Sequence, residues 1–222
     1  MGFLDRLNAR RQQEPEPAPE PVPDAPVVED PIFATKALRK FLGMLEAKDA
    51  PTLLDLAPVV SSNLNFFGEH LGCKVIIEDT YSQVETFARE QKADELAAAF
   101  ATRFAHANNS VDGILCWDLM DYLDRPAAAA LAHELTRMLR PDGALLAFFG
   151  TASPRDVHYT RYVIMDDVNL RYRRYPASRG RQGVFANRDI IKLFEHLRVT
   201  DSFLLQNNLR EILFRKPTYD TR

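Results

Sequence analysis

The chain from Ile32 onward alternates between two patterns of apolar residues. Short, nearly continuous apolar runs predict strands buried on both faces, as in the middle of a parallel sheet. Longer stretches in which apolar residues recur every three or four positions predict amphipathic helices that pack on such a sheet. The expected strands span residues 52–56, 73–77, 110–118 and 144–149. The expected helices carry their buried residues within 37–45, 64–71, 81–104, 131–139 and 190–197.

Turn and cap residues separate these elements. Ser61 or Ser62 is expected to cap the second helix, and Gly72 is expected to end it. Pro126 suits the first turn of the helix that follows residues 110–118. The segment LRPDG predicts a turn, Asn187 is expected to cap the last helix, and NN at 207–208 predicts a hairpin because asparagine tolerates positive φ.

This alternation predicts an α/β fold with three layers. A mainly parallel sheet is expected between two layers of helices, and an antiparallel C-terminal hairpin closes it. We expect the domain to cover residues 32–217, followed by a short tail at 218–222.

The N-terminal part has a different composition. Residues 1–13 predict a short amphipathic segment, in which a few apolar residues stand beside arginines. Residues 14–31 are rich in proline and glutamate and predict a disordered linker. Two interpretations remain for residues 1–13: a peptide that docks on a protein or membrane surface, or a tail whose leucines have no partner.

Composition narrows the class of protein. A net charge of −3 and a pI near 6.0 argue against nucleic-acid binding as a general property. Cys73 and Cys116 each lie in an apolar run and are expected to be buried free thiols, which favours a cytoplasmic location. No apolar stretch is long enough for a transmembrane segment, and no metal-ligand spacing is present.

Four segments resemble class I S-adenosylmethionine-dependent methyltransferases. LLDLAP resembles the first strand and loop of that family, VIIED the second strand with its acidic end, VDGILCWDLMDYL the fourth strand, and LRPDGALLAFF the fifth. The resemblance covers residues 34–217. It implies a Rossmann-like methyltransferase fold and S-adenosylmethionine as cofactor.

The resemblance also implies positions for that cofactor. Its methionine end would lie against the loop after the first strand, and Glu78 or Asp79 would hold the ribose hydroxyls. The acid at the strand end has an alternative role, because it can cap the following helix. The cofactor-binding residues implied are Asp55, Ala57, Ser61, Asn63, Glu78, Asp79 and Asp118.

Two departures from the family pattern bear on the cofactor. Residues 57–61 contain no glycine, and Pro58 lacks a backbone donor. No strand that ends in an acid is found between Gln91 and Val111, where the family contacts the adenine. We therefore expect the cofactor to bind weakly or not at all.

Candidate catalytic residues follow the strand at 110–118. Asp118 and Asp121 are expected to orient the acceptor or take its proton, although Asp118 can equally cap the next turn. His158 is a further candidate base. It lies in the segment 155–181, which is rich in arginine and tyrosine and suits a small-molecule or anionic substrate, or else forms a solvated strand pair.

Two functional hypotheses result. The first is an S-adenosylmethionine-dependent methyltransferase that acts on an unidentified small or anionic acceptor. The second is a catalytically inactive methyltransferase-fold protein that serves as an interaction or scaffold module. A nucleotide-dependent oxidoreductase is not indicated, because no G-x-G-x-x-G follows a strand.

Overall fold

The computed structural model describes residues 30–152 and 157–218. The predictions for residues 1–13 and for nearly all of the linker 14–31 therefore lie outside the described residues, as does most of the tail 218–222. At the described end of the linker, Asp30 pairs with Arg173 and the carbonyl of Pro31 accepts a hydrogen bond from Tyr172.

The described chain contains strands, α-helices and two 3₁₀ turns. The strands are β1 (Ile32–Ala34), β2 (Thr52–Asp55), β3 (Lys74–Ile77), β4 (Val111–Trp117), β5 (Leu139–Gly150), β6 (His158–Ile164), β7 (Asn169–Pro176), β8 (Arg198–Leu204) and β9 (Leu209–Arg215). The helices are α1 (Leu38–Glu46), α2 (Ser61–Leu71), α3 (Thr80–Arg89), α4 (Leu96–Arg103), α5 (Arg125–Met138) and α6 (Asn187–Leu193), with 3₁₀ turns η2 (Ala93–Glu95) and η3 (Leu119–Tyr122).

The main sheet has six strands in the order β3-β2-β4-β5-β9-β8. β3, β2, β4 and β5 pair in parallel, whereas β9 runs antiparallel to both β5 and β8. This arrangement confirms the predicted α/β fold with a mainly parallel sheet and a closing hairpin. Asn208, with φ of 59°, supplies the positive φ expected at that hairpin.

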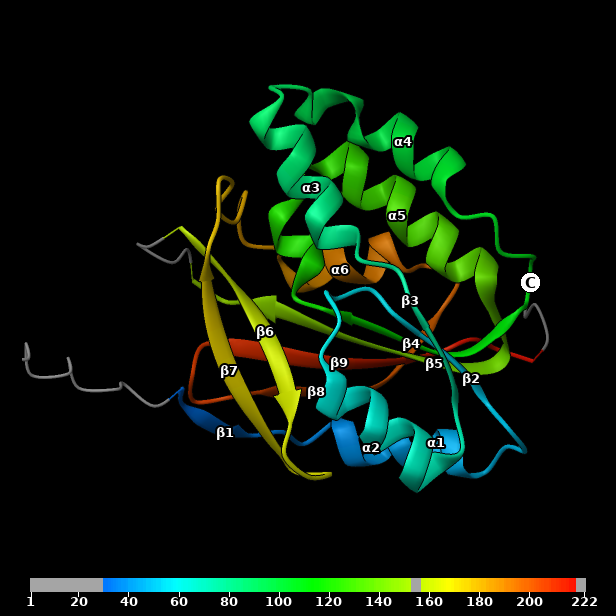
Figure 1. Cartoon of the computed structure of the whole chain (residues 1–222). Coiled ribbons are helices and arrows are strands. Elements are labelled where there is room, and N and C mark those ends of the chain that lie inside the picture. The colour runs from blue at the N-terminus through cyan, green and yellow to red at the C-terminus, as the bar shows by residue number, and fades with distance from the viewer. Residues whose placement is uncertain (1–29, 153–156, 219–222) are drawn as a thin grey trace, which may run out of the picture.

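Helices cover both faces of the main sheet (Figure 1). α3, α4, α5 and α6 pack on one face, around a core that includes Phe100, Leu131 and Phe194. α1 and α2 pack on the other face, where Phe41 and Phe67 are fully buried. Both cysteines are buried free thiols, as predicted.

A second, antiparallel sheet of three strands has the order β1-β7-β6. It stands across the end of the main sheet at which β5 terminates (Figure 1). Its residues Tyr162, Ile164, Leu170 and Tyr172 join the core on the α1 and α2 side. The strand pair expected in segment 155–181 is therefore present, but it is packed into the protein on one face rather than solvated on both.

Three local predictions are wrong. The N-cap of α2 is Val60 rather than Ser61 or Ser62, and that of α6 is Ala186 rather than Asn187. In both helices the last residue with extended backbone lies one position before the polar residue, which is already helical. The segment LRPDG is not a free turn but the start of β5. The amide of Asp142 donates to the carbonyl of Lys216, and the amide of Lys216 donates to the carbonyl of Gly143. Asp142 has φ of 65° and the pairing with β4 shifts register here, so the segment forms an irregular start of β5.

Other boundaries are close to those expected. Gly72 ends α2 in the left-handed conformation, and Pro126 lies in the first turn of α5. No strand occurs between Gln91 and Val111, all of which the structure describes. Within residues 30–152 and 157–218 every helix is too short or too polar to cross a bilayer.

Candidate functional site

The predicted site residues gather at the carboxyl ends of three neighbouring strands. Asp55 is the last residue of β2, Glu78 follows β3 directly, and Asp118 follows β4 directly. β2 lies between β3 and β4 in the sheet, and the amide of Glu78 donates to the carbonyl of Asp55 at 2.9 Å. The sheet therefore brings the three carboxylates to one edge.

Asp55 is buried at this edge. Its Oδ1 accepts hydrogen bonds from the amide of Ala57 at 3.0 Å and from Nε1 of Trp117 at 2.7 Å. Burial nevertheless raises the pKa of Asp55 to about 6, because the loss of solvent outweighs the two hydrogen bonds that favour the carboxylate.

Trp117 was not anticipated as a site residue. It ends β4 at a register shift and has φ of 51°, a conformation that is rare for a bulky side chain. Its ring stacks on Tyr162 of β6, with centroids 5.0 Å apart and planes 6° from parallel. Only one feature of the sequence points to it, a large aromatic residue at a strand end where the chain must turn.

The first turn of α2, after the loop that follows β2, contacts the second sheet. Asn63 is buried, its Nδ2 donates to the carbonyl of Tyr162, and its Oδ1 accepts from the amide of Ile164, both at 2.8 Å. Its side chain therefore ties α2 to β6. Ala57 is half-buried, Ser61 is exposed, and Pro58 is buried.

The two acids after β3 have different surroundings. Asp79 caps α3, since its carboxylate accepts hydrogen bonds from the amide and the hydroxyl of Ser82. Glu78 instead lies 3.0 Å from Nη2 of Arg103 and 3.0 Å from Nε2 of His106. Asp79 thus takes the capping role, and Glu78 is the strand-end acid within a cluster of basic side chains.

Asp118 and Asp121 share one arginine. Nη2 of Arg181 donates to Oδ2 of Asp118 at 2.7 Å, and Nη1 lies 3.5 Å from Oδ2 of Asp121. Asp121 also accepts from the amide of Gly150 at 2.7 Å. A side chain at Gly150 would clash with Nη1 of Arg181, so this glycine leaves room for the guanidinium.

Burial also affects the pKa of Asp121. It raises the pKa of Asp121 to about 7, although Arg181 and the Gly150 amide act in the opposite direction. Oδ1 of Asp121 is buried and has no hydrogen-bond partner among the described residues. His158 lies on β6, and its carbonyl accepts from the hydroxyl of Tyr122 at 3.0 Å, next to this cluster.

The segment after β7 is hydrogen-bonded to α3 and to η3 beside this edge. The amides of Ser178 and Arg179 donate to Glu85 of α3, and the amide of Gln182 donates to the carbonyl of Asp121 at 2.6 Å. Sequence reasoning located the arginines of this segment but not their partners, because those partners lie some 60 to 90 positions away in the chain.

The carboxylates at this sheet edge fit the chemistry of S-adenosylmethionine. A strand-end carboxylate suits two ribose hydroxyls, and further carboxylates suit the positive charges of the methionine end. Glu78, Asp55 and Asp118 supply these groups, but each is also bonded to a basic or N–H group of the chain itself. Binding the cofactor would exchange some of these internal contacts.

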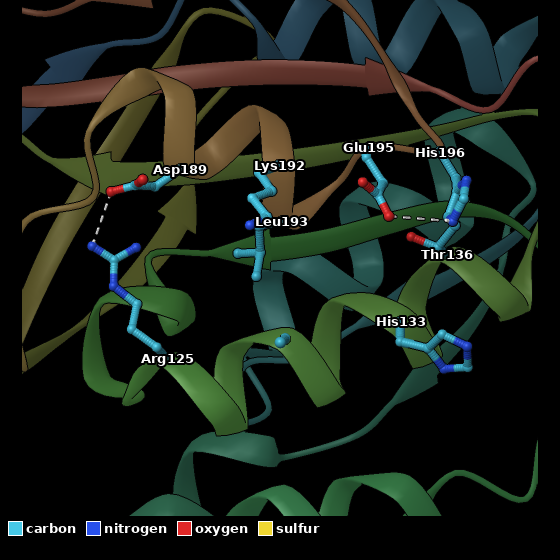
Figure 2. Close-up of a pocket in the computed structure, with 9 residues that line it drawn as sticks. Arg125, His133, Thr136, Asp189, Lys192, Leu193, Glu195 and His196 are labelled. Carbon is cyan, nitrogen blue, oxygen red and sulfur yellow. Dashed lines mark hydrogen bonds and ion pairs between the residues drawn. The ribbon is translucent and has the colours of Figure 1, made fainter.

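A separate hollow of about 440 Å³ lies between α5 and α6 (Figure 2). Arg125 pairs with Asp189 at one end, and Glu195 lies beside His196 at the other. None of the predicted site residues lines it. The hollow therefore belongs to the outer helical layer rather than to the strand ends.

Comparison with known proteins finds a methyltransferase domain in part of the chain. Residues 54–147, from β2 into β5, match a family model described as a methyltransferase domain. No curated protein matches the chain. The fold is similar to that of the Burkholderia thailandensis 1,6-didemethyltoxoflavin-N1-methyltransferase, with 16% identity over 82% of this chain and 78% of that chain and a TM-score of 0.47.

Two further solved structures are similar to a comparable degree. A SAM-dependent methyltransferase from Aquifex aeolicus has 14% identity over 80% of this chain and 88% of that chain, with a TM-score of 0.46. The CcbJ methyltransferase from Streptomyces caelestis has 13% identity over 81% and 95%, with a TM-score of 0.49. Residues 54–147 therefore match a methyltransferase domain, and they lie on a Rossmann-like sheet with the order β3-β2-β4-β5-β9-β8.

Proposed function

We propose that the protein is an S-adenosylmethionine-dependent methyltransferase that acts on a small or anionic acceptor. The convergence of Asp55, Glu78 and Asp118 on one sheet edge is the observation that supports this most. Open α/β sheets bind their ligands in the crevice outside the carboxyl ends of the strands. Carboxylates on three adjacent strands would meet both the ribose and the cationic end of the cofactor there.

Each residue has a stated part in this proposal. Glu78 accepts hydrogen bonds from the ribose hydroxyls, and Asp55 and Asp118 face the cationic methionine end. Ala57 and Ser61 border that end, Asp79 holds α3 in place, and Asn63 holds β6 against the loop.

The acceptor must lose a proton as it is methylated. When bound, the cofactor supplies a methyl group on a sulfonium, and the electron pair of the breaking carbon–sulfur bond stays on sulfur. Asp121 takes the acceptor's proton, because a pKa of about 7 suits proton transfer near neutral pH and its Oδ1 has no partner among the described residues. His158 is the second candidate for this proton, and Arg181 positions both aspartates.

Titration calorimetry with S-adenosylmethionine and S-adenosylhomocysteine tests the proposal. We expect both to bind the unchanged protein, and Glu78→Gln to weaken binding at least tenfold, because the amide removes one acceptor and the charge. Asp79→Asn is the matched control and should bind like the unchanged protein, since asparagine also caps helices. Equal binding by all three proteins would show that the ribose lies elsewhere.

The second candidate is an interaction module without catalysis. One observation favours it: each of the three carboxylates already has a partner within the protein. Asp55 is bonded to Trp117, Glu78 to Arg103 and His106, and Asp118 to Arg181. If the cofactor cannot displace these internal contacts, neither S-adenosylmethionine nor S-adenosylhomocysteine produces heat with the unchanged protein at millimolar concentration. That result would replace the first proposal by the second.

A further inference from the structure

A hollow of about 260 Å³ lies between the second sheet and the tip of the β8–β9 hairpin. Strands far apart in the sequence form its walls. Phe33 comes from β1, Tyr162 from β6, Tyr172 from β7, and Asn207 from the hairpin. The volume is slightly below the roughly 300–1,000 Å³ typical of pockets for drug-sized ligands, so it suits a small molecule.

The side chains around this hollow favour an anion. Arg174, Arg181 and His158 line it, and no acidic residue is among its lining residues, all of which the structure describes. Asp118 and Asp121 lie behind Arg181 and offset much of its charge. Arg174 is exposed and forms no ion pair with any residue in 30–152 or 157–218, so its charge is available to a ligand.

A buried hydroxyl group points to a polar ligand. Tyr162 is 2% exposed, and its hydroxyl has no hydrogen-bond partner within the described parts of the chain. A buried hydroxyl without a partner is unfavourable, which makes it a candidate ligand contact. Burial keeps the pKa of Tyr162 well above its usual value, so the group remains an O–H donor at neutral pH.

The walls also favour a flat ligand. Phe33 and Tyr172 meet edge to face at 4.8 Å, and so do Tyr162 and Tyr172 at the same centroid distance. Aromatic faces and edges arranged in this way pack well on another ring. Tyr162 also stacks on Trp117, and Arg181 reaches Asp118, so the hollow borders the proposed methyl-transfer site.

We propose that this hollow binds a small aromatic carboxylate and that this is the acceptor class of the enzyme. The identification as acceptor rests on the proposed function. The carboxylate lies between Arg174 and the hydroxyl of Tyr162, and the ring packs on Phe33 and Tyr172.

The test uses benzoate and its uncharged isostere benzamide as probes, titrated into the full chain without cofactor and followed by ¹H–¹⁵N NMR. We expect benzoate to bind in the millimolar range, with shifts in β6, β7 and the β8–β9 hairpin, and benzamide to bind at least tenfold more weakly. Equal binding of the two probes, or no benzoate shifts at tens of millimolar, would overturn the proposal.

Matched variants locate the charge. Arg174→Gln should weaken benzoate binding at least tenfold, and Tyr162→Phe at least threefold. Arg173→Gln is the control, because Arg173 directly precedes Arg174 on β7, pairs with Asp30 and does not line the hollow. An Arg174→Gln variant that binds benzoate normally would place the anion elsewhere and contradict the proposal.

Titrations with benzoate and with S-adenosylmethionine together distinguish failure of the carboxylate site from failure of the proposed function. Benzoate binding without any binding of S-adenosylmethionine would support the hollow as a carboxylate site and remove its role as acceptor site. Binding of S-adenosylmethionine without benzoate binding would leave the methyltransferase proposal standing and overturn the carboxylate site.

Discussion

At the scale of single residues, burial affects the pKa values of Asp55 and Asp121 more strongly than their hydrogen-bond partners do. Asp55 accepts two hydrogen bonds and Asp121 accepts one and lies near an arginine, yet the pKa of each is raised, to about 6 and about 7. Removing a carboxylate from water is more costly than one or two such contacts can offset. These side chains are thus retained at a cost to stability, which is common for functional groups.

This cost predicts a pH dependence of stability. A raised pKa means that the folded state binds the proton more tightly than the unfolded chain, so an ionised Asp121 destabilises the fold above pH 7 and protonation relieves this as the pH falls. As the pH falls from 8 to 6, we expect protonation of Asp121 to raise the free energy of unfolding by about 1–1.5 kcal/mol.

Urea unfolding of Asp121→Asn and of the unchanged protein at pH 6, 7 and 8 measures this contribution. The difference in stability between the two proteins should change across that range, because asparagine does not titrate. A constant difference at all three pH values would mean that Asp121 titrates in the folded protein as it does in the unfolded chain.

At the scale of elements, the sequence predicted what local patterns determine. The four parallel strands, the end of α2 at Gly72 and the hairpin at Asn208 each depend on residues within a few positions of one another. The packing of the second sheet does not depend on such local residues. It depends on contacts such as that between Asn63 and β6, about 100 positions apart, and on a Trp117 conformation that no propensity favours.

The candidate site divides in the same way. Glu78 and Asp118 could be located because each directly follows a recognisable strand. Their partners Arg103, His106 and Arg181 could not, since the spatial meeting of these side chains follows from the sheet order rather than from a motif.

The link between α2 and β6 is itself testable. Asn63→Ala removes both hydrogen bonds and leaves the carbonyl of Tyr162 and the amide of Ile164 buried without these partners, so we expect a loss of about 2–3 kcal/mol in the free energy of unfolding. Asn65→Ala is the control on the exposed face of α2 and should change stability by less than about 0.5 kcal/mol. Denaturant titration of both variants decides the matter; equal losses would show that Asn63 contributes no more than a surface residue.

At the scale of the whole molecule, two sheets meet where function is proposed. The main sheet supplies the carboxylates, and the second sheet contacts this edge through Tyr162, which stacks on Trp117 and accepts a hydrogen bond from Asn63. The second sheet has only three strands and shares its core with α1 and α2. A sheet of this size with one covered face is expected to be stable only while it is packed on the main sheet.

The single tryptophan of the chain reports on this junction, because Trp117 belongs to the main sheet and stacks on Tyr162 of the second. If the two sheets unfold as one unit, urea transitions followed by tryptophan fluorescence and by far-ultraviolet circular dichroism have the same midpoint. Tyr162→Ala should lower that midpoint in both signals together, by about 3–5 kcal/mol of unfolding free energy. A fluorescence change at lower urea than the loss of secondary structure would instead reveal a second sheet that opens by itself, and the sheet edge would then be accessible to ligands without global unfolding.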